Sequence, residues 1–248
     1  MKKRCYLQRC KEILVRFNLT YILLNKEICQ DMNIGILLAA GASDRFDNPI
    51  SKVLYKFHNK PIIKYSTDIL CEYLDEVIIV TNKDCSKNVG KLFVKNKKIK
   101  IVVNHLEKRL DSIKIGLDFI TSCHGDSSSN ILIHDAARPF ISSQMIEALL
   151  VSANSYPYSQ YYLELVNGLV QKTINDYTVV DREKYIELCT PQIIEYHLFN
   201  FLFRKYIYPK NRVSCEILPI LNRFNIASNL IQGSQRYLRK ITTTDDMY

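Results

Sequence analysis

The sequence is poor in the residues and runs that mark unusual classes of protein. It has 7 glycines and 7 prolines in 248 residues, and it contains no internal repeat or low-complexity tract. No uninterrupted apolar run approaches the roughly 18 residues that a membrane helix needs, because the best candidates, residues 19–24 and 34–40, have the length of strands. With 47% hydrophobic and 24% charged residues, the sequence predicts one globular domain with no membrane span.

No Cys-x-x-Cys pair is present, although the chain has eight cysteines. Scattered cysteines of this kind are typical of free thiols in a reducing compartment, and they argue against a zinc site or a disulfide framework. The sequence therefore predicts a cytoplasmic protein. The cysteines are Cys5, Cys10, Cys29, Cys71, Cys85, Cys123, Cys189 and Cys215.

A basic stripe interleaved with aromatic residues, as single-strand binders use, is also missing. The net charge is +9, but residues 1–31 carry seven Lys or Arg against three Asp or Glu, so +5 remains for the rest of the chain. A polyanionic small molecule such as a nucleoside triphosphate accounts for that surplus as well as RNA does. We therefore expect no nucleic-acid partner.

What the sequence does contain is an alternation of short apolar runs with segments of helical period. This pattern predicts an α/β protein with a doubly wound, mostly parallel sheet covered by helices on both faces. The predicted strands cover residues 34–40, 77–81, 99–103 and 131–133, and the predicted helices cover 61–73, 84–94, 112–121, 142–153 and 195–206.

Two segments depart from this alternation. Residues 155–190 contain strand-like pieces around polar turns, which predicts an inserted β-arm. Residues 1–31 are basic and weakly amphipathic, and we expect them to form an extension outside the fold, which begins at residue 32. In order of preference, this extension is read as upstream sequence from a misplaced start codon, as a targeting peptide or as an accessory helix, so an organelle address stays open.

The first predicted strand runs into AAGASDRF at residues 39–46, followed by Lys52. Small side chains at the end of a strand let backbone N–H groups approach phosphates, and Arg45 and Lys52 can neutralise their charge. The segment is neither a Walker A loop nor a G-x-G-x-x-G fingerprint. A tight turn with two solvated basic residues is the alternative interpretation.

A second segment, HDAARPF at residues 134–140, follows another predicted strand. A carboxylate at the carboxyl end of a parallel strand lies where ligands bind in such sheets, and Asp135 there can hold Mg²⁺ together with phosphate oxygens. The alternative is a strand-ending turn in which Asp135 caps the turn and Arg138 pairs with it.

Together these segments resemble the 2-C-methyl-D-erythritol 4-phosphate cytidylyltransferase family, which is related to the ribitol-phosphate cytidylyltransferases. The resemblance covers residues 33–246 and implies a Rossmann-like fold of the nucleotide-diphospho-sugar transferase type. Further segments match in family order: 109–117 (RLDSIKIGL), 180–182 (VDR), 190–192 (TPQ), 239–242 (RKIT) and 245–246 (DD).

The resemblance also implies roles for individual residues. The catalytic cations are Arg45, Lys52 and Lys240, and Asp135 is the metal ligand. Arg182 binds the acceptor phosphate from the arm of a neighbouring subunit, which implies a homodimer. The nucleotide-binding residues are Ala39, Ala40, Gly41, Ser43, Arg109, Ser112, Asp135 and Ala136.

The implied activity uses CTP and Mg²⁺ to convert 2-C-methyl-D-erythritol 4-phosphate into CDP-methylerythritol and pyrophosphate, a step in isoprenoid precursor synthesis. A phosphate oxygen of the acceptor attacks the α-phosphorus in line, so the protein has to position the reactants and neutralise their charge.

Several positions depart from the family pattern. Ser43 stands where the family usually has glycine, Ser51 and Val53 flank Lys52 in place of proline and glutamine, and residues 105–107 (HLE) replace a glycine-rich segment. Leu169 replaces a threonine that would bond the acceptor phosphate. Two alternatives therefore stay open, namely transfer to another polyol phosphate such as ribitol 5-phosphate, and a catalytically weakened homologue that binds nucleotide without turnover.

Overall fold

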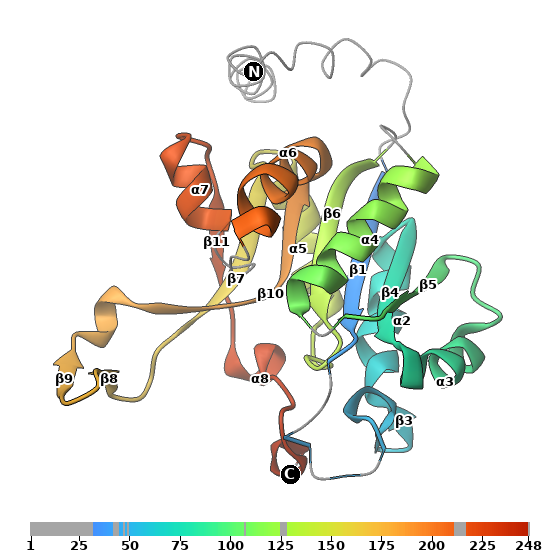
Figure 1. Cartoon of the computed structure of the whole chain (residues 1–248), viewed down its shortest axis with the longest axis horizontal. Helices are drawn as coiled ribbons and strands as arrows, with labels where there is room; N and C mark the ends of the chain where they lie inside the picture. Colours follow the sequence, from blue (N-terminus) through green and yellow to red (C-terminus); the bar gives the residue numbers. More distant parts are fainter. Residues whose placement is uncertain are drawn as a thin grey trace.

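A seven-stranded mixed sheet forms the centre of the molecule (Figure 1). The computed structural model describes residues 32–247, with gaps at 42–44, 47, 49, 107, 125–127 and 211–216, so the predicted extension over residues 1–31 lies outside the described residues. The strand order is β11-β7-β10-β6-β1-β4-β5. The strands are β1 (Met32–Ala39), β4 (Glu76–Asn82), β5 (Ile99–Asn104), β6 (Ser128–Asp135), β7 (Tyr158–Glu164), β10 (Ile186–Glu195) and β11 (Asn229–Gln232).

The four strands that carry the site are parallel. β1 pairs with β4 on one side and β6 on the other, and β4 pairs with β5. The strand β10 then runs antiparallel between β6 and β7, and the edge strand β11 is parallel to β7. The carboxyl ends of β1, β4, β5 and β6 therefore meet at one edge of the sheet, where open α/β sheets bind their ligands.

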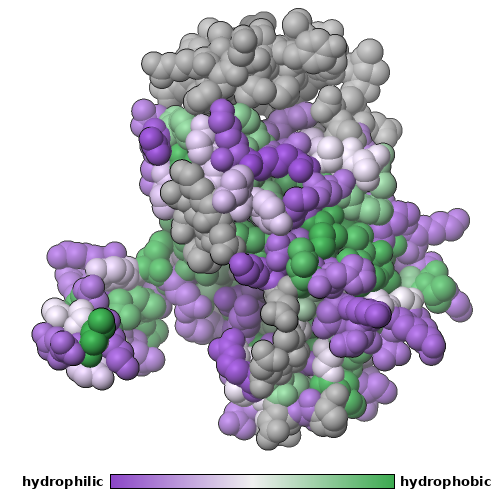
Figure 2. Space-filling model, in the orientation of Figure 1, coloured by the Kyte–Doolittle hydropathy of each residue, from purple (hydrophilic) through white to green (hydrophobic). Residues whose placement is uncertain are grey.

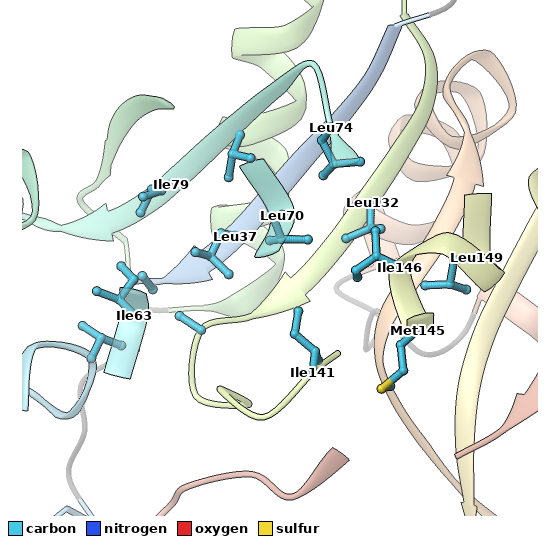
Figure 3. Packing of buried hydrophobic residues seen from close by; sticks show 14 of the residues in the cluster. Leu37, Ile63, Leu70, Leu74, Ile79, Leu132, Ile141, Met145, Ile146 and Leu149 are labelled. Atoms are coloured by element: carbon cyan, nitrogen blue, oxygen red, sulfur yellow. The ribbon is translucent and has the colours of Figure 1, made fainter. Parts of the chain in front are cut away.

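Helices cover both faces of the sheet, as the sequence predicts. The helices α2 (Ile62–Tyr73), α3 (Lys83–Phe93) and α5 (Ser143–Ala153) contribute to one buried cluster, part of which is drawn in Figure 3. The helices α4 (Arg109–His124), α6 (Tyr196–Leu202) and α7 (Ile217–Arg223) contribute to a second one. The remaining helical pieces are α8 (Gln235–Leu238), 3₁₀ turns at Lys52–Leu54, Arg182–Lys184, Tyr208–Lys210 and Thr244–Met247, and a π-helical turn at Phe203–Ile207.

The strand β1 separates the two clusters, because its successive side chains point to opposite faces of the sheet. Leu37 belongs to the first cluster, whereas Ile34 and Ile36 belong to the second, and all three are fully buried. A strand buried on both faces reads as a continuous apolar run, which is why residues 34–40 could be recognised from the sequence.

Both ends of the predicted arm over residues 155–190 belong to the main sheet, as β7 and β10. The reason is that each of these strands has a neighbour on both sides, so that Tyr158, Tyr161 and Cys189 are buried, whereas an arm would expose them. The part outside the sheet spans residues 165–185 and contains the hairpin of β8 (Leu169–Lys172) and β9 (Tyr177–Val180). Figures 1 and 2 show this hairpin extending away from the body.

A smaller hairpin of β2 (Lys56–Phe57) and β3 (Lys60–Pro61) follows the Lys52 turn. Its connecting residues His58 and Asn59 have φ of 45° and 62°, which is the left-handed conformation of a tight two-residue turn. Among the described residues, no helix combines the length and the apolarity needed to cross a bilayer.

The contact between α4 and β1 depends on a missing side chain at Gly116. A Cβ there would lie 2.9 Å from Cγ2 of the buried Ile36. We expect Gly116→Ala to lower the free energy of unfolding by about 1–3 kcal/mol, because the added methyl group would overpack the core between α4 and β1. Urea denaturation followed by circular dichroism measures this change.

The matched control is Gly90→Ala in α3, where the nearest atom to the new Cβ, Cδ1 of Ile101, is 4.0 Å away. This substitution is expected to raise the free energy of unfolding by about 0.5–1 kcal/mol, since glycine is a poor helix residue. A stabilising effect of both substitutions would show that α4 moves off β1 without cost.

Candidate active site

The candidate site is built around Asp135, the last residue of β6. Its Oδ1 accepts hydrogen bonds from Arg109 Nη2 at 3.1 Å and Nε at 3.3 Å, and its Oδ2 accepts one from Lys240 Nζ at 2.9 Å. Burial alone would raise the pKa of this carboxyl, but the two cations outweigh burial and hold the pKa well below its usual range. Asp135 is therefore a fixed negative charge at neutral pH.

Three elements distant in sequence bring these groups together. Arg109 begins α4, Asp135 ends β6, and Lys240 lies in the segment that follows α8. The backbone of Asp135 is fixed as well, because its N–H donates to Thr190 Oγ1 at 3.1 Å.

Two further cations lie close to this ion-pair cluster. Lys52 is half-buried, and burial together with the charges of Lys240 and Arg45 lowers its pKa, against the opposing charge of Asp135. Arg45 itself is exposed. Four cations around one central aspartate leave a surplus of positive charge, which suits a ligand with several phosphate groups.

The loop after β1 opens toward solvent residue by residue. Ala39 is buried, Ala40 is half-buried and Gly41 is exposed. A Cβ built on Gly41 meets no atom of the described residues within 4 Å. Ser43 lies outside the described residues.

Two predicted nucleotide-binding residues prove to be deeply buried. Ser112 is 4% exposed, and its Oγ accepts a hydrogen bond from Asn104 Nδ2 at 2.8 Å. Ala136 is fully buried, and its N–H donates to the Leu38 carbonyl at 3.0 Å. In this structure both side chains lie beneath the surface of the site.

Arg182 is not part of the cluster. It lies in the arm, where Nη1 donates to the Val166 carbonyl, and no contact joins it to Asp135 among the described residues. Within one chain, the structure brings Arg45, Lys52, Arg109, Asp135 and Lys240 together and leaves Arg182 apart.

The turn after Asp135 also holds the segment that carries Lys240. The buried Arg138 donates through Nη1 to the Leu238 carbonyl, and the Ala137 carbonyl accepts from Ile241 N at 2.8 Å. The structure thus gives Arg138 a different partner from the Asp135 side chain considered above. The contacts of Arg138 with Leu238 and of Thr190 with Asp135 join segments far apart in the chain, so motif spacing does not predict them.

His134 packs beside this turn as a neutral histidine. Its Nε2 lies 2.9 Å from the Arg138 carbonyl and so carries the proton, whereas the buried Nδ1 has no hydrogen-bond partner among the described residues. Burial lowers the pKa of His134 to about 4 from its ordinary value of 6.5. The histidine is a structural group rather than a base.

This pKa shift predicts an acid-sensitive fold. Because the folded pKa lies below the unfolded one, the unfolded chain binds more protons between pH 6.5 and 4, and stability is lost as the pH falls through that window. We expect the free energy of unfolding to drop by about 2 kcal/mol from pH 7 to pH 5 through this group. Urea titrations at pH 7, 6 and 5 measure the slope.

The comparison variant is His134→Gln, whose side-chain N–H can still donate to the Arg138 carbonyl but does not titrate. Its stability should vary less over the same pH range. An identical slope in both proteins would mean that the acid sensitivity arises elsewhere.

Magnesium is implied by the resemblance, and Asp135 is the residue that would hold it. Among the described residues no cluster of three or more His, Cys, Asp or Glu side chains could form a cage for a metal ion. Magnesium, however, is commonly bound by one or two carboxylates together with substrate phosphates and water. The ionised Asp135 carboxylate fits an ion shared with phosphates at Oδ2, which keeps a lone pair beside the hydrogen bond from Lys240, whereas Oδ1 already accepts two hydrogen bonds from Arg109.

Comparison with known proteins gives matches over almost the whole described chain. The family model described as "IspD: 2-C-methyl-D-erythritol 4-phosphate cytidylyltransferase" matches residues 34–248. A protein of that name from Clostridium botulinum strain Langeland is 30% identical over 223 residues, covering 87% of this chain and 94% of the relative. One from Thermotoga neapolitana is 26% identical over 218 residues, with 87% and 94% covered.

Solved structures share the fold. A 4-diphosphocytidyl-2C-methyl-D-erythritol synthase from Anaerococcus prevotii superposes with a TM-score of 0.73 at 20% identity, covering 88% of this chain and 95% of that one. The 2-C-methyl-D-erythritol 4-phosphate cytidylyltransferase of Francisella tularensis gives 0.68 at 25% identity, with 88% and 97% covered. The chain belongs to the 2-C-methyl-D-erythritol 4-phosphate cytidylyltransferase family.

Proposed function

We propose that this chain transfers the cytidylyl group of CTP to 2-C-methyl-D-erythritol 4-phosphate, releasing pyrophosphate, as a step of isoprenoid precursor synthesis. The observation that carries the proposal is the cluster of Arg45, Lys52, Arg109 and Lys240 around Asp135 at the carboxyl edge of the parallel strands. Membership of the family supplies the substrates.

In the proposed reaction, an oxygen of the acceptor phosphate forms a bond to the α-phosphorus of CTP while the bond between that phosphorus and the bridging oxygen to the β-phosphate breaks. No side chain needs to remove a proton, because the attacking phosphate is already ionised at neutral pH. The protein has to align the two anions and offset the charge on the departing pyrophosphate.

The cations of the cluster divide this work. Lys52, Arg45 and Lys240 offset charge on the triphosphate, and Asp135 keeps Arg109 and Lys240 in fixed positions through its two ion pairs. Residues 39–41 present their backbone to the nucleotide, and Ser112 and Ala136 lie beneath the nucleotide-binding surface. Asp135 would hold the magnesium ion, which would supply additional neutralisation of the phosphate oxygens.

The acceptor phosphate needs a cation of its own, and we assign it to Arg182 of a second copy of the chain. The arm that carries Arg182 exposes several large apolar side chains, among them Val166, Ile174, Tyr177 and Val179, and Ile174 is completely exposed. Figure 2 shows apolar residues among the mostly hydrophilic surface of this hairpin, and large apolar side chains exposed close together commonly mark a protein contact. A homodimer formed through the arm covers these residues and completes the site.

Leu169 is the observation that keeps a second acceptor under test. It is half-buried in β8, opposite Val180, and its side chain has no hydrogen-bond donor for a phosphate. Ribitol 5-phosphate is therefore the second candidate acceptor.

We place the reaction in the cytoplasm, because Cys71, Cys85, Cys123 and Cys189 are all free thiols.

The deciding experiment measures pyrophosphate release from CTP and Mg²⁺ with methylerythritol 4-phosphate and ribitol 5-phosphate in parallel, with Lys52→Ala as the control. Turnover of the first acceptor alone, lost in the variant, supports the proposal. Turnover of the second alone moves the protein to glycan synthesis and makes Leu169 a specificity residue. Silence with both acceptors supports a weakened homologue.

A further inference from the structure

Asp246, in the 3₁₀ turn Thr244–Met247, has no part in the transfer described above, yet its carboxylate accepts several hydrogen bonds. Its Oδ2 accepts hydrogen bonds from Thr242 N at 2.6 Å, from Thr243 N at 2.8 Å and from Thr243 Oγ1 at 3.3 Å. These hydrogen bonds from the backbone of Thr243 and Thr242 hold the pKa of Asp246 below its usual range, so the carboxylate is ionised. One charged oxygen thus closes the backbone into a tight loop.

That loop begins immediately after Lys240. The next three backbone N–H groups are all engaged, the first, at Ile241, by the Ala137 carbonyl and the next two by Asp246. A flexible lysine gains a defined reach only when the backbone beneath it is fixed. The Lys240 Nζ lies 2.9 Å from Asp135 Oδ2, at the centre of the site.

The turn that carries Asp246 is itself anchored to the body of the protein. Met247, the next residue, is 8% exposed and packs in a small apolar cluster with Phe46, Ile62 and the fully buried Ile241. Figure 1 shows the C-terminal end of the chain beside the β2–β3 hairpin. This packing holds the turn that carries the Asp246 carboxylate in place, as is required if the carboxylate is to fix the backbone of residues 242 and 243.

The charge of Asp246 also reaches the other lysine of the site. Burial, Lys240 and Arg45 lower the pKa of Lys52, and the charges of Asp135 and Asp246 oppose them. Asp246 is thus one of two carboxylates that offset the mutual repulsion of the lysines, although it pairs directly with neither of them in the described structure.

We infer that Asp246 is a positioning residue for nucleotide binding, which fixes the backbone after Lys240 so that the ammonium group meets the phosphates of CTP. The inference rests on the proposed function, because those phosphates are the ligand that Lys240 would contact. It adds a residue that touches neither substrate and acts through Lys240.

The test compares Asp246→Ala with Asp245→Ala by calorimetric titration with CTP in the presence of Mg²⁺. Asp245 is a matched control, since it is the adjacent residue of the same type, is exposed, and makes no hydrogen bond or ion pair among the described residues. Asp246→Ala is expected to weaken CTP binding about tenfold, because small misplacements of a charged contact are costly. Asp245→Ala should bind CTP like the wild type.

The same comparison in a Lys240→Ala background separates positioning from general damage. If Asp246 acts through Lys240, its removal has little further effect once Lys240 is absent. Asp246→Asn, which keeps an oxygen acceptor for the two backbone N–H groups, should recover much of the affinity. Hydrogen exchange should show faster exchange at residues 241–243 in Asp246→Ala and unchanged protection in the β1 and β6 strands.

Equal CTP affinities in Asp246→Ala and Asp245→Ala would overturn the inference, and so would an undiminished loss in the Lys240→Ala background. Should Asp246→Ala fail to fold, the asparagine variant decides. A partial loss of CTP affinity together with faster exchange at residues 241–243 supports the tether, because the neutral amide oxygen is a weaker acceptor for Thr242 N and Thr243 N. Wild-type affinity with unchanged exchange, or weakened affinity with slow exchange, contradicts it. All these readouts need CTP and no acceptor. A wild-type protein that binds CTP but releases no pyrophosphate with methylerythritol phosphate therefore refutes the proposed function without touching this result.

Discussion

Asp135→Asn is expected to lower kcat/KM for CTP by a factor of about 10²–10³, comparable to the loss of one well-placed charged group in other active sites. Asparagine has nearly the same shape as aspartate, so the backbone hydrogen bond to Thr190 Oγ1 should persist. What disappears is the charge that pairs with Arg109 and Lys240 and that would hold magnesium. Steady-state pyrophosphate release over a range of CTP and Mg²⁺ concentrations measures the effect.

Two features make this result specific to the charge of Asp135. The Mg²⁺ concentration for half-maximal rate should rise in the variant, because one hard oxygen ligand is replaced by a neutral amide. Asp68→Asn is the control, since Asp68 forms a surface ion pair with Lys60 at 2.8 Å, and its loss should leave the rate unchanged. A rate for Asp135→Asn within about threefold of the wild type would remove this aspartate from the centre of the mechanism.

The sheet could be predicted from sequence where its strands are buried on both faces. Residues 34–40 and 77–81 read as continuous apolar runs because β1 and β4 lie between two layers of helices. The edge strand β11 was not predicted, because it is four residues long and only partly buried, so its sequence has no strong pattern. Its parallel pairing with β7 depends on packing between segments far apart in the chain.

The motifs predict which residues belong to the site, but they do not predict how these residues contact one another. The family resemblance implies that Arg109, Asp135 and Lys240 belong to one site, but spacing alone gives no sign that Asp135 binds the other two at once, across 26 and 105 residues. Nor does spacing show that Ser112 and Ala136 are buried. Burial and long-range ion pairs arise from how the elements pack, which the local sequence does not encode.

Mixing two inactive variants should restore activity if the site is shared between chains. Lys52→Ala removes a cation of the Asp135 cluster, and Arg182→Ala removes the arm cation, so each homodimer should lose about a hundredfold in kcat/KM. In a mixed dimer, one site receives both defects and the other receives neither. Random pairing of equal amounts should therefore recover about a quarter of the wild-type activity.

The control for this experiment is a mixture of Lys52→Ala and Lys240→Ala. These two lysines lie in the same cluster of one chain, where the charge of Lys240 lowers the pKa of Lys52, so every site in the mixed dimer keeps one defect. No recovery is expected from that pair. Recovery there would show contamination by wild-type protein rather than a site shared between chains. Absence of recovery with Arg182→Ala, in dimers shown to be mixed by mass spectrometry, would mean that the arm does not complete a neighbour's site. Its exposed apolar hairpin would then need another partner, because Val166, Ile174 and Val179 are exposed and not covered by the part of the chain that the structure describes.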